Sequence, residues 1–244
     1  MEITGAVILV SGAAGNIGGH LAKDLADRGA RVIAVDMVAP ALLVEGVQYH
    51  VADLTDPKAV EALLDKVVAE AGPPNVLINT AGIIHNALLF NLFDRNDGRH
   101  PLDAWTTTVA SNLDTAFFLG RETVARMVKS RTKGVVLNFS SMAADGNAGQ
   151  SAYSAAKAAL ESLTVTWSKE LGPFGIRVNA VAPGFIDTPS TAKALTPPQI
   201  ATWIKQVPAA RMGTLAEIAH AVRFIIENDY YNGKVLRVDG GLRI

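Results

Sequence analysis

An apolar run near the amino terminus passes directly into a glycine-rich turn and then into a helical pattern, and this order constrains the fold more than any other feature. Residues 6–10 (AVILV) are typical of a buried strand. The sequence SGAAGNIGG follows, with glycine at positions 12, 15 and 18. Ile17, Leu21 and Leu25 then recur at helical spacing, and Gly29 is a typical residue for ending a helix. A strand, a tight turn and a helix in this order predict the first crossover unit of a parallel α/β sheet.

The rest of the chain continues this alternation of strands and helices. Further strands are predicted at 31–35, 47–51, 76–78, 135–139, 177–182 and 234–238. Asp56 caps a helix that begins at Pro57, and Thr214 with Glu217 forms a capping box that opens another helix. Because the sequence shows no linker, repeat or low-complexity segment, we expect residues 1–244 to form a single α/β domain.

The composition excludes several classes of protein. The chain has 244 residues, of which 49% are apolar and 18% are charged, as in one large globular domain. Its formal net charge is −1 and it has no basic block, so nucleic acid is not an expected partner. The lack of cysteine excludes disulfides, thiolate metal sites and a cysteine nucleophile. The five histidines show no metal-binding spacing, so we expect no metal site.

No segment is predicted to direct the chain to a membrane. The first residues, MEITG, lack the basic region of a signal peptide. No apolar run approaches the ~18 residues needed to span a bilayer. We therefore expect a soluble, cytoplasmic protein, and the lack of cysteine fits a reducing compartment.

The glycine turn and a carboxylate downstream predict a dinucleotide site. Glycines let the backbone approach a pyrophosphate, and the following helix N-terminus offers free N–H groups and the positive end of a dipole. Asp36 follows the strand predicted at 31–35 and lies eighteen residues after Gly18, about where a carboxylate would meet the adenosine ribose hydroxyls. The alternative interpretation is a solvated aspartate at a strand end.

The residues after Asp36 favour NAD over NADP. The sequence MVAP contains no arginine or lysine that would receive a 2′-phosphate. Two like charges ~4 Å apart cost on the order of 4 kcal/mol at an effective dielectric constant near 20. We therefore expect kcat/KM to be higher with NAD(H) by about a hundredfold or more.

The sequence from position 140 to 157, SSMAADGNAGQSAYSAAK, predicts where the chemistry takes place. Tyr153 and Lys157 are four residues apart on a predicted helix, so their side chains share one face. A free tyrosine has a pKa of about 10, and a shift of ~3 units by a neighbouring ammonium needs roughly 4 kcal/mol. Ser140 and Ser141 follow the strand at 135–139, near the same substrate oxygen. The arrangement suits acid–base chemistry on an alcohol or a carbonyl, although in an arbitrary helix such a pair more often lies on the surface.

Two segments are predicted to shape the substrate site. Residues 85–103 are the least regular part of the chain, and residues 189–210 form an expected mobile cover with a short helix near Pro197. Asn112 lies in the helix after the first segment, where an asparagine favours a specific partner or a local bulge, the alternative being a solvent-facing side chain. The apolar residues that indicate a hydrophobic pocket, or equally core packing, are Ile84, Leu88, Leu89, Phe90, Phe185, Leu195 and Trp203.

Taken together, these residues resemble the short-chain dehydrogenase/reductase family, in its short NAD-type branch. The resemblance covers essentially the whole chain and rests on the glycine turn, Asp53, NTAG at 79–82, Asn112, the serine pair, Tyr153 with Lys157, PGFIDT at 183–188 and VDGG at 238–241. It implies a Rossmann-like, doubly wound parallel sheet of about seven strands with helices on both faces. It also implies reversible hydride transfer between NAD(H) and a secondary alcohol or ketone, in a homotetramer or homodimer.

The resemblance assigns roles to individual residues. Tyr153 matches the catalytic acid–base, Lys157 the residue that binds the nicotinamide ribose and lowers the tyrosine pKa, and Asn112 the residue that holds a water in a proton relay. Asp36 matches the ribose-binding acid of NAD-dependent members. The other positions that match cofactor contacts are Gly12, Gly15, Asn16, Ile17 and Gly18 at the turn, Asp53 and Leu54 at the adenine, Asn79, Ala81 and Gly82 in NTAG, and Pro183, Gly184, Ile186 and Thr188 in PGFIDT.

Three positions depart from the family pattern or are ambiguous. Asn16 replaces the usual second glycine, which we expect to be tolerated because asparagine accepts a positive φ better than most residues. Thr80 replaces a second asparagine and is expected to change only a supporting contact. The substrate-orienting serine is Ser140 by its distance from the tyrosine, or Ser141 by its place in the strand-end pattern, and we favour Ser141. Neighbouring strand residues face opposite ways, so only one of the two should reach the substrate.

Two rival functions stay open at this point. The segment GNAGQSAY and the carboxyl-terminal half resemble 3-oxoacyl thioester reductases acting on acyl carrier protein or CoA substrates. Such enzymes generally use NADPH, which Asp36 opposes. The other rival is a non-catalytic, NAD-binding regulatory protein, against which the retained Asn112, Tyr153 and Lys157 argue.

Overall fold

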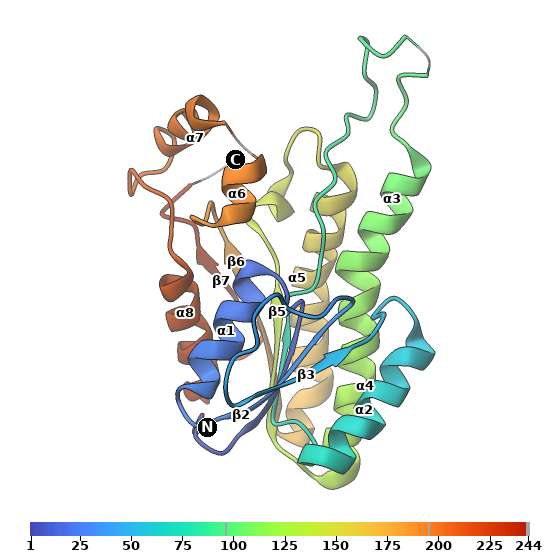
Figure 1. Cartoon of the computed structure of the whole chain (residues 1–244), viewed down its shortest axis with the longest axis vertical. Coiled ribbons are helices and arrows are strands. Elements are labelled where there is room, and N and C mark those ends of the chain that lie inside the picture. Colours follow the sequence, from blue (N-terminus) through green and yellow to red (C-terminus); the bar gives the residue numbers. More distant parts are fainter. Residues whose placement is uncertain (96, 195, 243–244) are drawn as a thin grey trace.

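A single parallel sheet runs through the computed structural model, which describes residues 1–95, 97–194 and 196–242 (Figure 1). Its order is β3-β2-β1-β4-β5-β6-β7. The strands are β1 (Val7–Ser11), β2 (Arg31–Asp36), β3 (Val47–Val51), β4 (Val76–Asn79), β5 (Gly134–Phe139), β6 (Ile176–Pro183) and β7 (Val235–Val238). Because the order reverses between β1 and β4, the sheet is doubly wound, which confirms the predicted Rossmann-like α/β fold.

Helices cover both faces of the sheet (Figure 1). One face is covered by α1 (Asn16–Ala26) and α8 (Leu215–Glu227), and the other by α2 (Pro57–Ala71), α3 (Leu102–Val109), α4 (Thr115–Ser130) and α5 (Ser151–Leu171). Each face has its own buried apolar cluster, because successive strand residues such as Leu9 and Val10 point to opposite sides. Within the described part of the chain, no helix is both long and apolar enough to cross a membrane.

Local sequence explains where two of these helices begin. The Asp56 side chain accepts a hydrogen bond of 2.9 Å from Lys58 N, and Pro57 is the first residue of α2. At α8, Thr214 and Glu217 form the reciprocal capping box that their spacing predicts. A cap of this kind contributes about 1 kcal/mol to helix stability, so both boundaries are largely decided by short-range contacts.

Some boundaries differ from the sequence-based prediction by one or two residues. The strand predicted at 6–10 is Val7–Ser11, because its pairing with β2 and β4 continues to Ser11. The helix that contains Tyr153 begins at Ser151, which places the tyrosine in the first turn of α5. The cover predicted at 189–210 contains α6 (Pro189–Ala194) and α7 (Pro197–Ile204), which lie beyond the carboxyl ends of the strands (Figure 1).

Candidate active site

The segments that carry the candidate residues meet at the carboxyl edge of the sheet. The glycine turn follows β1, the NTAG segment begins at the end of β4, and the serine pair follows β5. Since β4 pairs with both β1 and β5, these three segments lie side by side. The crevice where the strand order reverses is the usual ligand site of an open α/β sheet.

Helix α5 presents the tyrosine and the lysine on one face, as their spacing predicts. Tyr153 is partly buried, and Lys157, one turn later, is only 4% exposed. The Lys157 ammonium donates a hydrogen bond of 2.8 Å to the carbonyl oxygen of Phe139, the last residue of β5. The same ammonium lies 5.4 Å from the centroid of the Tyr153 ring.

Burial decides the proton affinities of these two groups. It raises the pKa of Tyr153, and a hydrogen bond with Ser141 offsets part of that shift. It lowers the pKa of Lys157 to about 8, because a buried ammonium loses its hydration. The net shift of the Tyr153 pKa is therefore upward, opposite to the direction expected from the sequence, and the effect of Lys157 on the phenolate stays a prediction. The ammonium is turned to a backbone carbonyl, and the pKa of the phenol is controlled by burial and by Ser141.

The two serines that follow β5 face opposite directions. Ser140 is 4% exposed, and its hydroxyl lies 2.8 Å from Glu161 Oε1 and 3.2 Å from the carbonyl oxygen of Lys157. Ser141 hydrogen-bonds to Tyr153 instead. An extended backbone imposes this alternation on neighbouring residues. The geometry therefore favours Ser141 as the substrate-orienting serine, and its catalytic role stays a prediction.

Asn112 lies in a π-helical turn, Ala110–Asp114, between α3 and α4. Its side chain is 1% exposed, and its Nδ2 donates to the carbonyl oxygens of Ile83 (2.7 Å) and Thr108 (2.9 Å). The structure thus shows both a specific partner and a local bulge. The Oδ1 atom is buried and has no hydrogen-bond partner among the described residues, so it is placed to accept a hydrogen bond from a small molecule such as water.

The glycine turn has no room for a side chain at two of its positions. Gly12 has a φ of +67°, and a Cβ there would lie 2.7 Å from Ala81 N. A Cβ on Gly18 would lie 2.3 Å from the carbonyl oxygen of Gly12. Gly15 is the N-cap of α1, whose first turn, including Ile17, contains no acidic residue. The first N–H groups of α1 lack intrahelical acceptors, which fits the binding of a pyrophosphate.

The conformation predicted for Asn16 is wrong. It is the first residue of α1, and it is not among the described residues that have a positive φ. A helix start accepts asparagine without a left-handed conformation, so the usual glycine is unnecessary here. Its Nδ2 donates a hydrogen bond of 2.5 Å to Ser190 Oγ on α6, which joins the glycine turn to the segment after β6.

Ser11, which the sequence analysis did not single out, joins the glycine turn to the NTAG segment. Its Oγ accepts hydrogen bonds of 3.2 Å from the backbone N–H groups of Thr80 and Ala81, and its carbonyl oxygen accepts one from the Thr80 hydroxyl. Thr80 therefore supplies a supporting contact. The Asn79 side chain is buried and donates to Asn138 Oδ1 at 3.0 Å, so it points into the sheet and not toward the turn. The position of Ser11 at a strand end directly before Gly12 was the available signal.

Two carboxylates lie where the adenosine end of a dinucleotide is predicted to bind. Asp36 Oδ2 accepts a hydrogen bond of 3.0 Å from Ala14 N, and Oδ1 accepts one of 2.7 Å from Met37 N, so the carboxylate lies against the glycine turn. Asp53 accepts hydrogen bonds from the backbone and the hydroxyl of Thr55, which lower its pKa. The Asp53 carboxylate is therefore already bound within its own turn.

The remaining residues that are predicted to contact the cofactor are mostly buried. Pro183 ends β6, and a Cβ on Gly184 would lie 2.7 Å from the Cα of Asp239, so this segment packs tightly against the chain after β7. Leu54, Ile186 and Thr188 are all less than one-tenth exposed. Their side chains serve packing, and only the Thr188 hydroxyl, which accepts from Thr191 N at 3.2 Å, presents a polar atom.

Residues 83–95 and 97–101 rise above the sheet edge as a narrow excursion (Figure 1). Ala87 N donates to the carbonyl oxygen of Gly149 at 2.8 Å, which anchors its base just before α5, and Phe90 forms an antiparallel bridge with Arg99. Of the seven residues predicted to line a hydrophobic pocket, the four in or near this excursion are exposed to at least one-half, namely Ile84, Leu88, Leu89 and Phe90. Core packing therefore does not explain them.

Two more of the seven pack together on the other side of the site. Phe185 follows β6 and Trp203 belongs to α7, and the centroids of their rings lie 5.1 Å apart. Leu195, the last of the seven, lies outside the described residues. The described apolar residues of this set therefore lie in two parts of the chain, one after β4 and one after β6.

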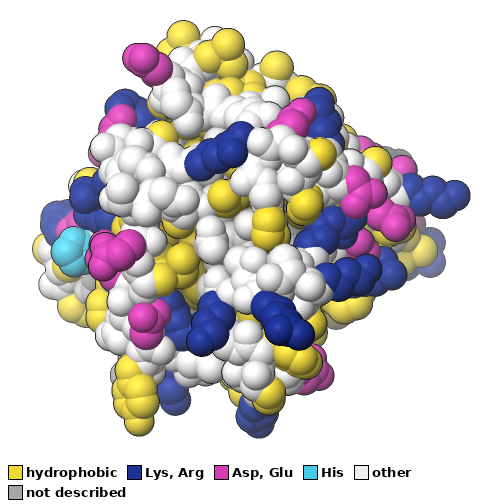
Figure 2. All heavy atoms as spheres, turned by 90° about the horizontal axis from the view of Figure 1, so that it is seen from below, with side chains coloured by type: hydrophobic (Ala, Val, Ile, Leu, Met, Phe, Trp, Pro, Cys, Tyr) yellow, Lys and Arg dark blue, Asp and Glu magenta, His cyan; other side chains and the backbone are white. Residues whose placement is uncertain are grey.

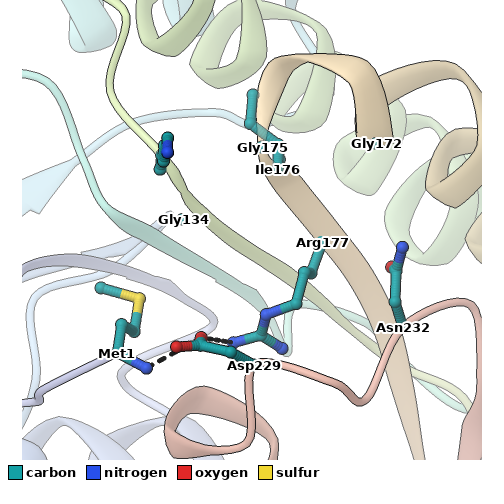
Figure 3. A pocket seen from close by; sticks show the side chains of 9 residues that line it. Met1, Gly134, Gly172, Gly175, Ile176, Arg177, Asp229 and Asn232 are labelled. Carbon is teal, nitrogen blue, oxygen red and sulfur yellow. Dashed lines mark hydrogen bonds and ion pairs between the residues drawn. The ribbon is translucent and has the colours of Figure 1, made fainter.

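A cavity of about 350 Å³ lies at the opposite end of the sheet, near the amino ends of β5 and β6 (Figure 3). Arg177 and the Met1 amine both pair there with Asp229, at 3.4 and 2.9 Å. Seen from below, the surface mixes basic, acidic and apolar side chains (Figure 2). None of the residues lining this cavity is a predicted site residue, so it is separate from the candidate active site.

Comparisons with known proteins agree with this geometry. Residues 12–243 match the family model described as enoyl-(acyl carrier protein) reductase. The chain is 36% identical over 251 residues to the 3-oxoacyl-[acyl-carrier-protein] reductase FabG of Escherichia coli (strain K12), covering 99% of each chain. It is also 36% identical over 255 residues to FabG of Thermotoga maritima, covering all of both. The solved structure of Thermoplasma acidophilum aldohexose dehydrogenase (AldT) superposes with a TM-score of 0.88, at 28% identity, over 98% of this chain and 94% of that one.

The fold and the site together define a nucleotide-binding oxidoreductase of the α/β class. The chain belongs to the short-chain dehydrogenase/reductase family, which confirms the resemblance found in the sequence. The match extends along the whole chain, so the glycine turn and the residues of α5 belong to one family pattern.

Proposed function

We propose that this protein is an NAD(H)-dependent oxidoreductase that interconverts a secondary alcohol and a ketone. The observation that carries the proposal is the convergence of Ser141, Tyr153 and Lys157 at the same carboxyl edge of the sheet as the glycine turn. A phenol bonded to a serine hydroxyl, with a buried ammonium one helical turn away, is suited to moving a proton to or from a substrate oxygen.

Each polar residue of the site has its own role in hydrogen bonding or proton transfer. In reduction, Ser141 donates a hydrogen bond to the carbonyl oxygen of the substrate, and Tyr153 transfers its phenolic proton to the same oxygen. In oxidation, Tyr153 takes that proton back. Lys157, with a pKa of about 8, is mostly charged at neutral pH and stabilises the phenolate that remains. The buried Oδ1 of Asn112 holds a water that returns a proton from solvent.

The residues at the carboxyl edge fit a dinucleotide. The first turn of α1 and the glycine turn would hold its pyrophosphate, and Asp36 its adenosine ribose. When bound, the dinucleotide would supply or accept the hydride at the substrate carbon. Residues 37–40 contain no arginine or lysine, so none of them would offset the repulsion between Asp36 and a 2′-phosphate beside it. This favours NAD as the cofactor.

A 3-oxoacyl thioester is the second candidate substrate. It is favoured by the relatives that carry the name 3-oxoacyl-[acyl-carrier-protein] reductase and match the whole chain. Its ketone needs the same hydrogen bond and the same proton as any other, so the roles of Ser141 and Tyr153 do not change. What distinguishes the two candidates is the substrate beyond the ketone, where the segments predicted to shape the substrate site, 85–103 and 189–210, would contact it.

The assembly belongs to the same proposal. The expected homotetramer would bury the helices that contain Asn112 and Tyr153 at one interface and the last helix and strand at another. Apolar side chains with about two-fifths or more of their surface exposed lie on these elements, namely Trp105 on α3, Phe117 on α4, Val165 on α5 and Phe224 on α8. Sedimentation equilibrium would give four times the 25.7 kDa chain mass for a tetramer or twice that mass for the alternative homodimer, and a monomer would contradict this part of the proposal.

A cofactor fluorescence assay tests the function directly. Secondary alcohols are offered with NAD, and ketones and 3-oxoacyl thioesters with NADH, each in parallel with the phosphorylated cofactor. We expect turnover with NAD(H) that disappears in Tyr153→Phe. NADH binding without turnover of any substrate would favour the regulatory protein instead, and a preference for NADPH would overturn the cofactor assignment.

A further inference from the structure

Four polar side chains from four elements form a chain behind the serine pair. Ser140, directly after β5, bonds to Glu161 Oε1 on α5 at 2.8 Å. Glu161 Oε2 lies 3.6 Å from Arg237 Nη2 on β7, and the same Nη2 donates to Asp145 Oδ1 at 3.0 Å. Asp145 ends the short 3-10 helix Met142–Asp145, which begins immediately after Ser141. These contacts therefore link Ser140, which precedes Ser141, to Asp145, which lies four residues after it, and they do not include the Ser141 hydroxyl.

Glu161 occupies a particular place on α5. It lies one turn beyond Lys157 and two turns beyond Tyr153, so the three residues form one row along the helix. The neighbouring serines reach the two ends of this row: Ser140 bonds to Glu161, and Ser141 bonds to Tyr153. Since the two serines are adjacent in the chain, a displacement of Ser140 would also displace Ser141.

The contact with Glu161 is the stronger of the two that Ser140 makes. A hydroxyl has one proton, and the acceptors are Glu161 Oε1 at 2.8 Å and the Lys157 carbonyl at 3.2 Å. Hydrogen bonds to an ionised acceptor are shorter and stronger than those to a neutral one. Ser140 is 4% exposed, so if the carboxylate is removed the acceptor that remains for its hydroxyl is the more distant Lys157 carbonyl.

We propose that Glu161 is a positioning residue for the reaction: it holds Ser140, and with Arg237 and Asp145 it fixes the strand end so that the Ser141 hydroxyl meets Tyr153. The inference rests on the proposed function, because Ser141 and Tyr153 are the reacting pair in that scheme. Glu161 itself touches neither the substrate nor the phenol.

Substitutions at Glu161 separate its roles. Glu161→Ala removes both the bond to Ser140 and the pairing with Arg237, and we expect kcat to fall about tenfold with the Kd for NADH within about twofold. Glu161→Gln keeps an acceptor for Ser140 and should retain kcat within about threefold. Glu170→Ala, an exposed glutamate on the same helix, is the matched control and should change nothing. A kcat within about twofold of wild type in Glu161→Ala would overturn the proposal.

A double-mutant cycle tests whether Glu161 acts through Ser141. In the Ser141→Ala background, the loss on adding Glu161→Ala should shrink from about tenfold to about twofold or less, because the hydroxyl to be positioned is gone. Losses that multiply would show a general structural role and contradict the proposal. Arg237→Met provides a second variant if Glu161→Ala folds poorly, with an expected loss of about threefold.

A readout that needs no turnover keeps this test separate from that of the proposed function. The hydrogen bond with Ser141 lowers the pKa of Tyr153, so losing it should raise that pKa. Tyrosine labelled with 13C and assigned by Tyr153→Phe reports the pKa by NMR titration. We expect Glu161→Ala to raise it as Ser141→Ala does, and Glu170→Ala to leave it unchanged. If all variants titrate alike, the positioning role is wrong; if the wild type turns over no substrate but Glu161→Ala still raises this pKa, only the proposed function fails.

Discussion

Lys157 Nζ donates a hydrogen bond of 2.8 Å to the carbonyl oxygen of Phe139, which joins the catalytic end of α5 to the end of β5. The ammonium is 4% exposed, and burial lowers its pKa to about 8. Since it also lies 5.4 Å from the centroid of the Tyr153 ring, one contact holds the helix against the sheet and keeps a positive charge near the proposed acid–base. This charge is costly to bury, and the cost can be measured.

The first prediction concerns the pH dependence of stability. The folded pKa of Lys157, about 8, lies below the unfolded value of about 10.4, so between these values the unfolded chain binds the extra proton. The free energy of unfolding therefore rises with pH in this window. Relative to Lys157→Met, it should rise by about 2 kcal/mol between pH values of about 7.5 and 10. Urea unfolding of both proteins measures the difference, and a constant difference would show that the ammonium is not buried.

The second prediction concerns the proton donor. Tyr153→Phe should lower kcat by about 10²–10⁴-fold, because it removes the proton and keeps the ring. The Kd for NADH should stay within about twofold. Tyr230→Phe is the control, since Tyr230 is fully exposed. Steady-state kinetics measure kcat, and NADH fluorescence titration measures the Kd. Retained turnover would exclude Tyr153 as the acid–base.

The third prediction concerns cofactor choice. Asp36→Asn removes the negative charge and keeps one oxygen, so it retains only one of the two hydrogen bonds that the carboxylate accepts from Ala14 N and Met37 N. We expect the preference for NADH over NADPH in kcat/KM to fall by about a hundredfold, mainly through a lower KM for NADPH. Asp103→Asn, on the first turn of α3, should leave the preference unchanged. A wild-type enzyme that prefers NADPH would defeat the assignment at once.

The fourth prediction separates the two serines. Ser141→Ala should lower kcat/KM by about a hundredfold, because the substrate oxygen loses its hydrogen bond. Ser140→Ala should lower kcat/KM only about fivefold, since Ser140 is hydrogen-bonded to Glu161 and affects the substrate only through the position of Ser141. Steady-state kinetics of the two variants decide the question. If Ser140→Ala alone abolishes turnover, the assignment of Ser141 is incorrect.

The fifth prediction concerns the packing around Asn112. A Cβ on Gly82 would lie 2.2 Å from Asn112 Oδ1, so Gly82→Ala must displace this side chain and its bonds to Ile83 and Thr108. We expect the free energy of unfolding to fall by about 1–3 kcal/mol and kcat to fall about tenfold. At Gly172 a Cβ would meet nothing within 4 Å, so Gly172→Ala should behave as wild type. Calorimetry and steady-state kinetics on the two alanine variants test this. Equal stability and equal kcat in the two variants would contradict the tight contact at Gly82.

The elements of the fold followed from the sequence because their signals are local. An apolar run, a glycine turn and a helical stripe each depend on residues close in the chain, as do the caps at Asp56 and Thr214. The family pattern added the order of the motifs. The pairing of Tyr153 with Lys157 on one helical face is of the same kind, since four residues of helix bring two side chains together wherever the helix lies.

Contacts between distant segments decided the rest. The bond between Ser140 and Glu161 spans β5 and α5, and the bond between Asn16 and Ser190 spans α1 and α6, so neither has a local signal. Burial, which raises the pKa of Tyr153 and lowers that of Lys157, is a property of the packed protein and not of the helix. The sequence by itself determined which chemical groups the site contains. Only the tertiary structure decided which way each group points and how tightly it holds its proton, because both depend on neighbours that folding brings together.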